Sequence, residues 1–166
     1  MTLPGIRLTF LILFLGSVGL MLTGMFLQYG LGLIPCALCI TQRIFIIAGG
    51  LAALIAFVHN PKGLGRRLYA FAGVALAVIG GGVSSRQLWL QSLPPDQVPA
   101  CGPDITYMFA NFPLREALDI LFRGDGNCAE VTWTFLGVSI AGWTLVAFTG
   151  IALINLWQAL RPKSLA

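Results

Sequence analysis

The chain has 166 residues, of which 57% are hydrophobic and only 10% are charged, and its mean hydropathy is +0.87. Soluble domains carry about 25% charged residues, so this composition excludes a soluble globular protein and predicts one integral membrane domain over residues 1–166. The net charge of +4 comes from short flanking segments, and no nucleic-acid-binding motif is present. We therefore exclude a nucleic-acid binder.

Four long apolar runs predict an all-α membrane protein built as a four-transmembrane-helix bundle. They cover residues 8–27, 40–58, 68–90 and 138–157. Each is close to the ~20 residues that a helix needs to cross about 30 Å of hydrocarbon, and backbone polar groups in lipid must be satisfied within the helix. Gly73, Ala77 and Gly81 recur at every fourth position of the third run. We interpret them as close contacts between helices.

The charged residues predict the orientation of these helices. All six acidic residues lie in the segment 91–137, whereas the flanks of the other membrane ends carry only basic residues, namely Arg7, Lys62, Arg66, Arg67, Arg161 and Lys163. Because basic residues are retained in the cytoplasm, we expect both termini and the loop at 59–67 to be cytoplasmic. The loops at 28–39 and 91–137 are then expected to face the opposite side, which is the periplasm if the host is a Gram-negative bacterium, with the protein in its inner membrane.

The long second outer loop contains one predicted helix. Between Pro113 and Gly124, apolar residues at helical spacing share one face of residues 114–122, opposite charged residues. Gly124 is placed to end this helix. We expect a short amphipathic helix that lies flat on the outer membrane surface. The alternative, a helix packed on a core of the loop itself, is less favoured because no other apolar element of the loop can receive it.

All four cysteines, Cys36, Cys39, Cys101 and Cys128, fall on the predicted outer side. Disulfides persist in that compartment, so an even number of cysteines there predicts two disulfides. A structural zinc site with four thiolates is the alternative, and a cytoplasmic location would have favoured it.

The Cys36-x-x-Cys39 pair stands at the start of the second apolar run. Pro35 suits the first position of a helix, and if the helix begins there, both cysteines lie in its first turn, where free N–H groups and the helix dipole favour thiolates. Arg43 follows Cys39 by four residues on the same face and can stabilise an anion there. Its alternative role is an interfacial arginine that reaches to lipid headgroups.

Arg86 lies near the outer end of the third run. It can extend the positive site of Arg43 or serve as a simple interface anchor. The chain has no Cys-x-x-Cys-His, no glycine-rich dinucleotide motif and a single histidine, His59. No motif therefore supplies a bound redox cofactor of the usual kinds. Two disulfides on one membrane face, one in an exposed loop and one at a helix end beside lipid, suggest a relay of electrons from a soluble dithiol into the membrane. A membrane-soluble acceptor remains for these electrons, and a quinone fits.

The chain resembles the DsbB family of disulfide-bond formation proteins over nearly its whole length. The matching segments are Pro35-Cys36-Ala37-Leu38-Cys39 with Arg43, the single Cys101, and Gly126-Asn127-Cys128-Ala129-Glu130, which leads to Trp133 and Phe135-Leu136-Gly137. Two features depart from the family's best-known member: Gln42 stands where that member has an acid, and no histidine lies near the outer end of the third run.

The resemblance implies a quinone-dependent dithiol oxidase that reoxidises the periplasmic protein DsbA. Reduced DsbA would attack Cys101 of a Cys101–Cys128 disulfide, and the released Cys128 would attack Cys36. Cys39 would then pass the electrons to ubiquinone or menaquinone held near Arg43, which restores the Cys36–Cys39 disulfide. Thiolate attack and leaving-group chemistry agree with these roles.

Two other functions stay open at this point. One is an oxidoreductase like vitamin K epoxide reductase, which the position of the Cys-x-x-Cys pair on the second helix rather than the last disfavours. The other is a structural membrane protein whose two disulfides only stabilise the fold.

Overall fold

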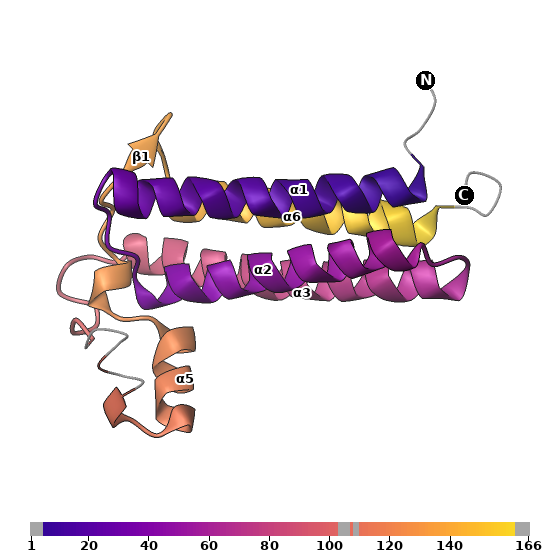
Figure 1. Ribbon diagram of the computed structural model, residues 1–166. Helices are drawn as coiled ribbons and strands as arrows, with labels where there is room; N and C mark the ends of the chain where they lie inside the picture. Colours follow the sequence, from indigo (N-terminus) through magenta and orange to yellow (C-terminus); the bar gives the residue numbers. More distant parts are fainter. Residues whose placement is uncertain (1–4, 103–106, 108–109, 162–166) are drawn as a thin grey trace.

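Four long helices packed side by side form the protein (Figure 1). The computed structural model of the chain describes residues 5–102, 107 and 110–161. The four helices are α1 (Ile6–Met25), α2 (Ala37–His59), α3 (Leu64–Gln91) and α6 (Ile140–Leu160). All four are long and apolar enough to cross a membrane. The predicted four-helix membrane fold is confirmed.

The helix ends differ from the apolar runs by a few residues, for physical reasons that hydropathy does not register. α3 begins at Leu64, directly after Gly63 at φ +57°, because the basic residues of its first turn are compatible with a helix although they are not apolar. α6 begins at Ile140 and not at Val138, because Ser139 is its N-cap and accepts a hydrogen bond from the Gly142 backbone N–H at 3.4 Å.

Small residues let α3 approach α6 closely along the middle of the bundle. A Cβ atom at Gly80 would lie 2.4 Å from the Phe148 ring, and one at Gly73 would lie 2.5 Å from the Asn155 side chain. Ala77 is buried in the same cluster as Phe148. The interpretation of the small residues as helix contacts is confirmed, with Gly80 rather than Gly81 making the closest approach to α6.

The elements that connect the helices lie at two ends of the bundle. Figure 1 shows the start of α1, the α2–α3 turn and the end of α6 at one end. The N-terminus of α2, the C-terminus of α3 and the long connection from α3 to α6 lie at the other end. We call that second end, which carries all four cysteines, the cysteine end.

A π-helical turn and a two-stranded hairpin at the cysteine end were not predicted from the sequence. α1 continues as one π-helical turn, η1 (Phe26–Gly30). Strands β1 (Thr134–Phe135) and β2 (Val138–Ser139) pair as an antiparallel hairpin. Its two turn residues, Leu136 and Gly137, both have positive φ, at 53° and 76°, which is the conformation that matches the twist of a two-residue hairpin. Strands this short leave no alternation of apolar and polar residues to detect.

The amphipathic helix of the long loop is present as α5 (Leu114–Arg123) and lies crosswise to the bundle at the cysteine end (Figure 1). Gly124 follows it at φ +73°, as expected for a residue that ends a helix. Leu114, Leu118 and Phe122 are at least 42% exposed, so an apolar face stays open to the surroundings. This arrangement agrees with a helix on a membrane surface.

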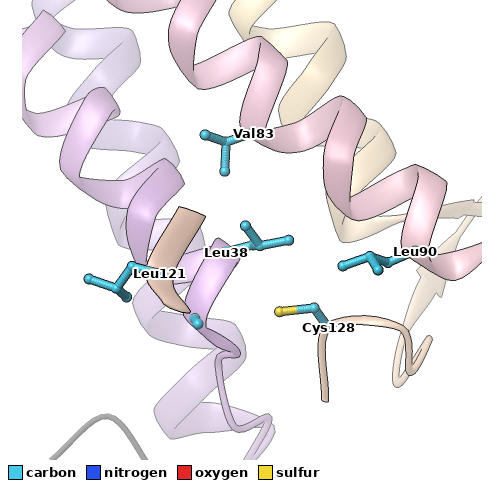
Figure 2. Close-up of a cluster of buried hydrophobic side chains, with 6 residues drawn as sticks. Leu38, Val83, Leu90, Leu121 and Cys128 are labelled. Atoms are coloured by element: carbon cyan, nitrogen blue, oxygen red, sulfur yellow. The ribbon is translucent and has the colours of Figure 1, made fainter. Parts of the chain in front are cut away.

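α5 is nevertheless anchored to the bundle, which the sequence did not reveal. Leu121 is only 4% exposed and packs in a cluster with Leu38 of α2 and Leu90 of α3 (Figure 2). The Thr41 hydroxyl donates a hydrogen bond to the Leu121 carbonyl at 3.3 Å. The loop sequence contains no other apolar element against which α5 could pack, and the end of the bundle provides that surface instead.

Candidate functional site

The Cys-x-x-Cys pair lies at the N-terminus of α2, with its two cysteines in different backbone conformations. Cys36 is the N-cap, with an extended backbone (φ −75°, ψ 172°), and its carbonyl accepts the first helical hydrogen bond from Ile40. Cys39 lies in the first turn. The expectation that Pro35 opens the helix is wrong by two residues, because Cys36 keeps the extended conformation of a capping residue and packs against the cluster around Cys128.

The sulfur atom of Cys36 interacts with two of the other three cysteines. The Cys36 Sγ is 3.2 Å from the Cys39 Sγ, and it also makes a hydrogen bond with Cys128. Cys128, in the short 3₁₀ turn η2 (Gly126–Cys128), is fully buried and meets Leu38 and Leu90 (Figure 2). Cys36 is therefore the sulfur that can exchange with either neighbour.

Cys101 is the exposed member of the set. It is a solvent-accessible thiol, whereas Cys128 is buried, and all four cysteines are free thiols. The segment of Cys101 is held against η2, since the Gly126 N–H donates to the Ala100 carbonyl at 3.2 Å. A Cβ atom at Gly126 would lie 2.5 Å from the Pro99 carbonyl oxygen and 3.2 Å from the Cys101 Sγ. Glycine at position 126 thus allows the two loop segments to approach.

Electrostatics distinguish Cys36 from Cys128. The hydrogen bond between them raises the pKa of the Cys36 thiol above its ordinary value and lowers that of Cys128. Burial also raises the pKa of Cys36, while the backbone N–H of Leu38, at the N-terminus of α2, further lowers the pKa of Cys128. Hydrogen bonds to the charged form favour it. Cys128 is therefore the thiol of the pair that ionises more readily, and Cys36 is the sulfur in contact with it.

A cavity opens beside Cys36 and Cys39 at the cysteine end. Its lining includes apolar residues of the bundle, among them Leu20, Leu27 and Ile46, and apolar loop residues such as Ile34 and Val131. Polar residues from five segments of the chain also line it, namely Gln28, Gln42, Arg43, Gln87, Gln91, Asn127, Glu130, Thr132, Ser139 and Thr144, together with Trp133. A planar ligand with an apolar tail and polar edges suits such walls.

Arg43 is the cation of this cavity. Its guanidinium donates hydrogen bonds to the Gln28 side-chain oxygen at 2.5 Å and to the Gly24 carbonyl at 3.0 Å, both from the end of α1. Within the part of the chain that the structure describes, no carboxylate lies within ion-pair distance of it. An arginine without a counter-ion inside a membrane helix is costly and indicates a functional role. The structure thus brings Arg43 and Cys39 together on one cavity wall.

Arg86 is turned away from this cavity. Its guanidinium lies over the Trp89 ring, 4.2 Å from the centroid, and its Nε donates to the Arg123 carbonyl at 3.3 Å. It is not among the residues that line the cavity. This geometry matches the interface-anchor alternative, and a quinone contact of Arg86 stays a prediction that the geometry does not support.

Sequence reasoning missed the polar side chains that surround the cysteines inside the helices. Gln42 of α2 and Gln87 of α3 are 2% and 4% exposed, and both have hydrogen bonds to partners on other helices or at the cysteines. From the sequence, Gln42 stands out only as a departure from a family pattern. The signal that could have found both is an uncharged polar side chain within a membrane run, which needs a partner there.

No group of three or more His, Cys, Asp or Glu side chains is arranged to hold a metal ion among the described residues. Four-thiolate zinc sites need all sulfurs around one point, whereas here Cys36 lies between Cys39 and Cys128 and Cys101 is on the surface. The zinc alternative gains no support from this placement.

Comparison with known proteins identifies the family. The model of the family described as "Disulfide bond formation protein DsbB" matches residues 6–158. The chain is 60% identical over 159 residues to Disulfide bond formation protein B of Saccharophagus degradans, covering 96% of both chains. It is 51% identical over 149 residues to the protein of that name from Nitrosococcus oceani (90% of this chain, 88% of the relative). It is 46% identical over 158 residues to the one from Methylococcus capsulatus (95% and 96%). The chain therefore belongs to the DsbB family and is a multi-pass membrane oxidoreductase of disulfide-bond formation.

Proposed function

We propose that this protein reoxidises a DsbA-like periplasmic thiol oxidase by disulfide exchange and passes the electrons to a membrane quinone, so that disulfides are generated de novo. The observation that carries the proposal is the contact of Cys36 with both Cys39, at 3.2 Å between the sulfur atoms, and Cys128, beside a cavity lined by Arg43. Sulfur atoms in such contact can move an electron pair from a surface thiol to the cavity by successive disulfide exchange.

The exposed Cys101 is where the partner enters, because the buried Cys128 is out of reach of a soluble protein. A partner thiolate attacks the Cys101 sulfur of a Cys101–Cys128 disulfide, and the bond's electron pair leaves on Cys128 as a thiolate. The partner's second thiolate then attacks the mixed disulfide, which releases oxidised partner and a Cys101 thiolate. Exchange of this kind depends on the access of the sulfur attacked and on the stability of the leaving thiolate.

The electron pair moves inward through Cys36. The Cys128 thiolate attacks Cys36 of the Cys36–Cys39 disulfide, a Cys36–Cys128 bond forms, and the pair leaves on Cys39. Cys101 then attacks Cys128 and releases Cys36 as a thiolate. While Cys36 is in its disulfide it has no proton to donate to Cys128, but the backbone N–H of Leu38 still favours the charged form of Cys128 and supports its role as attacking thiolate. A thiolate attacks better than a thiol.

The cavity walls fit a quinone, either ubiquinone or menaquinone. Leu20, Leu27 and Ile46 offer an apolar surface toward the bundle, and Arg43 and Gln28 offer polar groups at the level of Cys39. A bound quinone supplies the acceptor for two electrons and two protons, by which the Cys36–Cys39 disulfide is restored. Arg43 would hold negative charge that develops beside Cys39, since it has no carboxylate partner among the described residues.

We also propose that the cysteine end faces the periplasm and that both termini are in the cytoplasm of a bacterial inner membrane. The α2–α3 turn, the start of α1 and the end of α6 lie together and carry basic residues, whereas the acidic residues gather in the connection from α3 to α6. This charge distribution supports the orientation.

The direct test is turnover with purified components. The protein in detergent is mixed with reduced DsbA and a short-chain soluble quinone, and loss of DsbA thiols is followed with a thiol reagent. We expect multiple turnovers that depend on both additions. The Cys39→Ser variant should show none, because the electron pair has no route to the cavity. Absence of turnover by the unaltered protein would reject the oxidase function, and full turnover by Cys39→Ser would reject the role of Cys39.

A further inference from the structure

Two buried glutamines, Gln42 and Gln87, connect the bundle interior to the cysteines by hydrogen bonds between uncharged side chains. The Gln87 amide nitrogen lies 3.3 Å from the Cys39 Sγ and 3.5 Å from the Cys36 Sγ, and its oxygen lies farther from Cys39, at 3.7 Å. Gln87 comes from α3 and the cysteines from the start of α2, so the contact also joins two helices.

The orientation of the Gln87 amide follows from its second neighbour. The Gln42 Nε2 donates to the Gln87 Oε1 at 2.8 Å, and the Thr144 hydroxyl of α6 donates to the Gln42 Oε1 at 2.8 Å. A side-chain amide has donors only on its nitrogen and acceptors only on its oxygen. Because the Gln87 oxygen is occupied by Gln42, the N–H groups of Gln87 are aimed at the sulfur atoms.

An N–H group at this place is needed most when Cys39 is a thiolate. A buried anion without a hydrogen-bond donor is strongly disfavoured. The Arg43 guanidinium already donates hydrogen bonds to the Gln28 side chain and to the Gly24 carbonyl at the end of α1. The Gln87 amide is a donor that carries no charge and does not titrate. It therefore offers the same hydrogen bond at every pH at which the protein folds.

We propose that Gln87 is a positioning residue that stabilises the Cys39 thiolate through its amide N–H, and that Gln42 and Thr144 act through Gln87 by holding its amide in the donating orientation. The inference rests on the proposed function in one respect, that Cys39 is the sulfur from which electrons leave the protein. The hydrogen-bond relay Thr144–Gln42–Gln87–Cys39 itself requires neither a quinone nor a partner protein.

The test measures the thiolate of Cys39 directly. A protein with Cys39 as its only cysteine (Cys36→Ser, Cys101→Ser, Cys128→Ser) is alkylated with iodoacetamide over a series of pH values, and the adduct is quantified by mass spectrometry. Only the thiolate reacts. Hydrogen bonds to charged groups are worth about 1.5–3 kcal/mol, so Gln87→Leu should slow alkylation about 10- to 100-fold at neutral pH. At high pH, where every thiol is ionised, the rates should converge.

Gln158→Leu in the same background is the matched control. Gln158 is also a buried glutamine of a membrane helix, and its amide donates to the Ile6 carbonyl at 3.2 Å at the opposite end of the bundle. Its replacement removes a buried amide without touching a cysteine, so alkylation of Cys39 should keep its rate and pH profile. Gln87→Leu with no larger effect than Gln158→Leu would overturn the proposal.

Two further variants separate orientation from simple packing. Gln42→Leu should slow alkylation less than Gln87→Leu, and the double variant should equal Gln87→Leu alone, because Gln42 acts only through Gln87. Thr144→Val should have the smallest effect, since the Thr144 hydroxyl also has the Ala141 carbonyl within 2.9 Å as a partner. Additive effects of the two glutamines would overturn the relay.

If Gln87→Leu does not fold, Gln87→Glu replaces it with a side chain of nearly the same size. The carboxylate lacks the N–H donor and adds a negative charge, so alkylation at neutral pH should slow at least as much. An unchanged rate would overturn the proposal. Since this assay contains no quinone and no DsbA, a lack of DsbA oxidation would count against the proposed function and leave the result for Gln87 intact.

Discussion

The cysteine end and the middle of the bundle are held together by different interactions. In the middle, which we call the packed half, Gly73, Ala77 and Gly80 of α3 let Asn155 and Phe148 of α6 fit closely. The only polar side chain of this set, Asn155, donates within its own helix, to the Ile151 carbonyl. The contact of α3 with α6 at these five residues therefore depends on shape, without a hydrogen bond between the two helices.

At the cysteine end, by contrast, side-chain hydrogen bonds run between helices. Gln42 reaches Gln87, Thr144 reaches Gln42, and Arg43 reaches Gln28. They surround a cavity instead of filling it. Lipid gives helices no hydrophobic reason to associate, so close packing supplies stability where it is possible. The comparison predicts that substitutions in the packed half change stability, and that those at the cysteine end change rates.

Gly80→Leu should have the largest effect on folding. A side chain at Gly80 would start 2.4 Å from the Phe148 ring, and overpacking of this kind costs about 3 kcal/mol at its upper end. Thermal unfolding in detergent, followed by circular dichroism, should show a clearly lower midpoint. Gly82→Leu on the same helix is the control, because nothing lies within 4 Å of a Cβ atom there. Equal midpoints for the two variants would contradict the packed half as the source of stability.

Leu121→Ala should loosen α5 without unfolding the bundle. Leu121 is 4% exposed and Leu118, in the same helix, is 42% exposed. Removing a buried leucine side chain costs about 2–5 kcal/mol, here applied to one short helix. Trypsin should therefore cut after Arg115 and Arg123 at least about tenfold faster than in the unaltered protein. Leu118→Ala should leave the cleavage rate unchanged. Equal protection of both variants would show that Leu121 does not anchor α5.

Arg43→Ala should weaken quinone use by about tenfold or more, measured as a higher KM for a soluble quinone at saturating DsbA, because a hydrogen bond from a charged group is lost. The midpoint of thermal unfolding should move little. Arg86→Ala tests whether Arg86 contacts the quinone, as the sequence led us to expect, or only anchors the interface. Because the Arg86 guanidinium lies over the Trp89 ring, we expect an unaltered KM for this variant. An unchanged KM for Arg43→Ala would return Arg43 to a structural role at the interface.

The pH profile of inward exchange should show the smallest effect. The backbone N–H of Leu38 favours the charged form of Cys128 and remains in place when Cys36 is in its disulfide, so we expect the Cys128 thiolate to persist below the pH at which an ordinary cysteine, with a pKa of about 8.5, becomes protonated. As the pH falls through the lowered pKa, the rate of Cys36–Cys128 formation should fall. This rate is measured by acid quench after mixing with reduced DsbA, followed by alkylation and mass spectrometry.

Asp125→Asn sharpens this test. The nearby Asp125 charge acts against the lowering of the Cys128 pKa, so its removal should shift the profile to lower pH and speed exchange about two- to threefold on the acidic side. Asp96→Asn, at an exposed position of the same connection, should change nothing. A profile that moves to higher pH with Asp125→Asn would contradict the sign of this effect.

The sequence by itself determined the four membrane helices, the amphipathic α5 and the gathering of the cysteines at one end. These features depend on local properties, namely the length of apolar runs, helical spacing and glycine at a helix end, which each segment carries independently of the others. Helix ends were displaced by a few residues, at Cys36 and Ser139 because a capping residue decided them, and at Leu64 because basic residues extend the helix beyond the apolar run.

Only the tertiary structure decided how the site is assembled. Gln42 and Gln87 are 45 positions apart, and Thr144 is 102 positions from Gln42, so no local pattern links them. The structure likewise placed Cys36 between two sulfurs, set Leu121 against Leu38, and turned Arg86 toward Trp89. Such contacts depend on which helices are neighbours. In a membrane, the packing of entire helix surfaces against each other determines the neighbours, and no single segment does so alone.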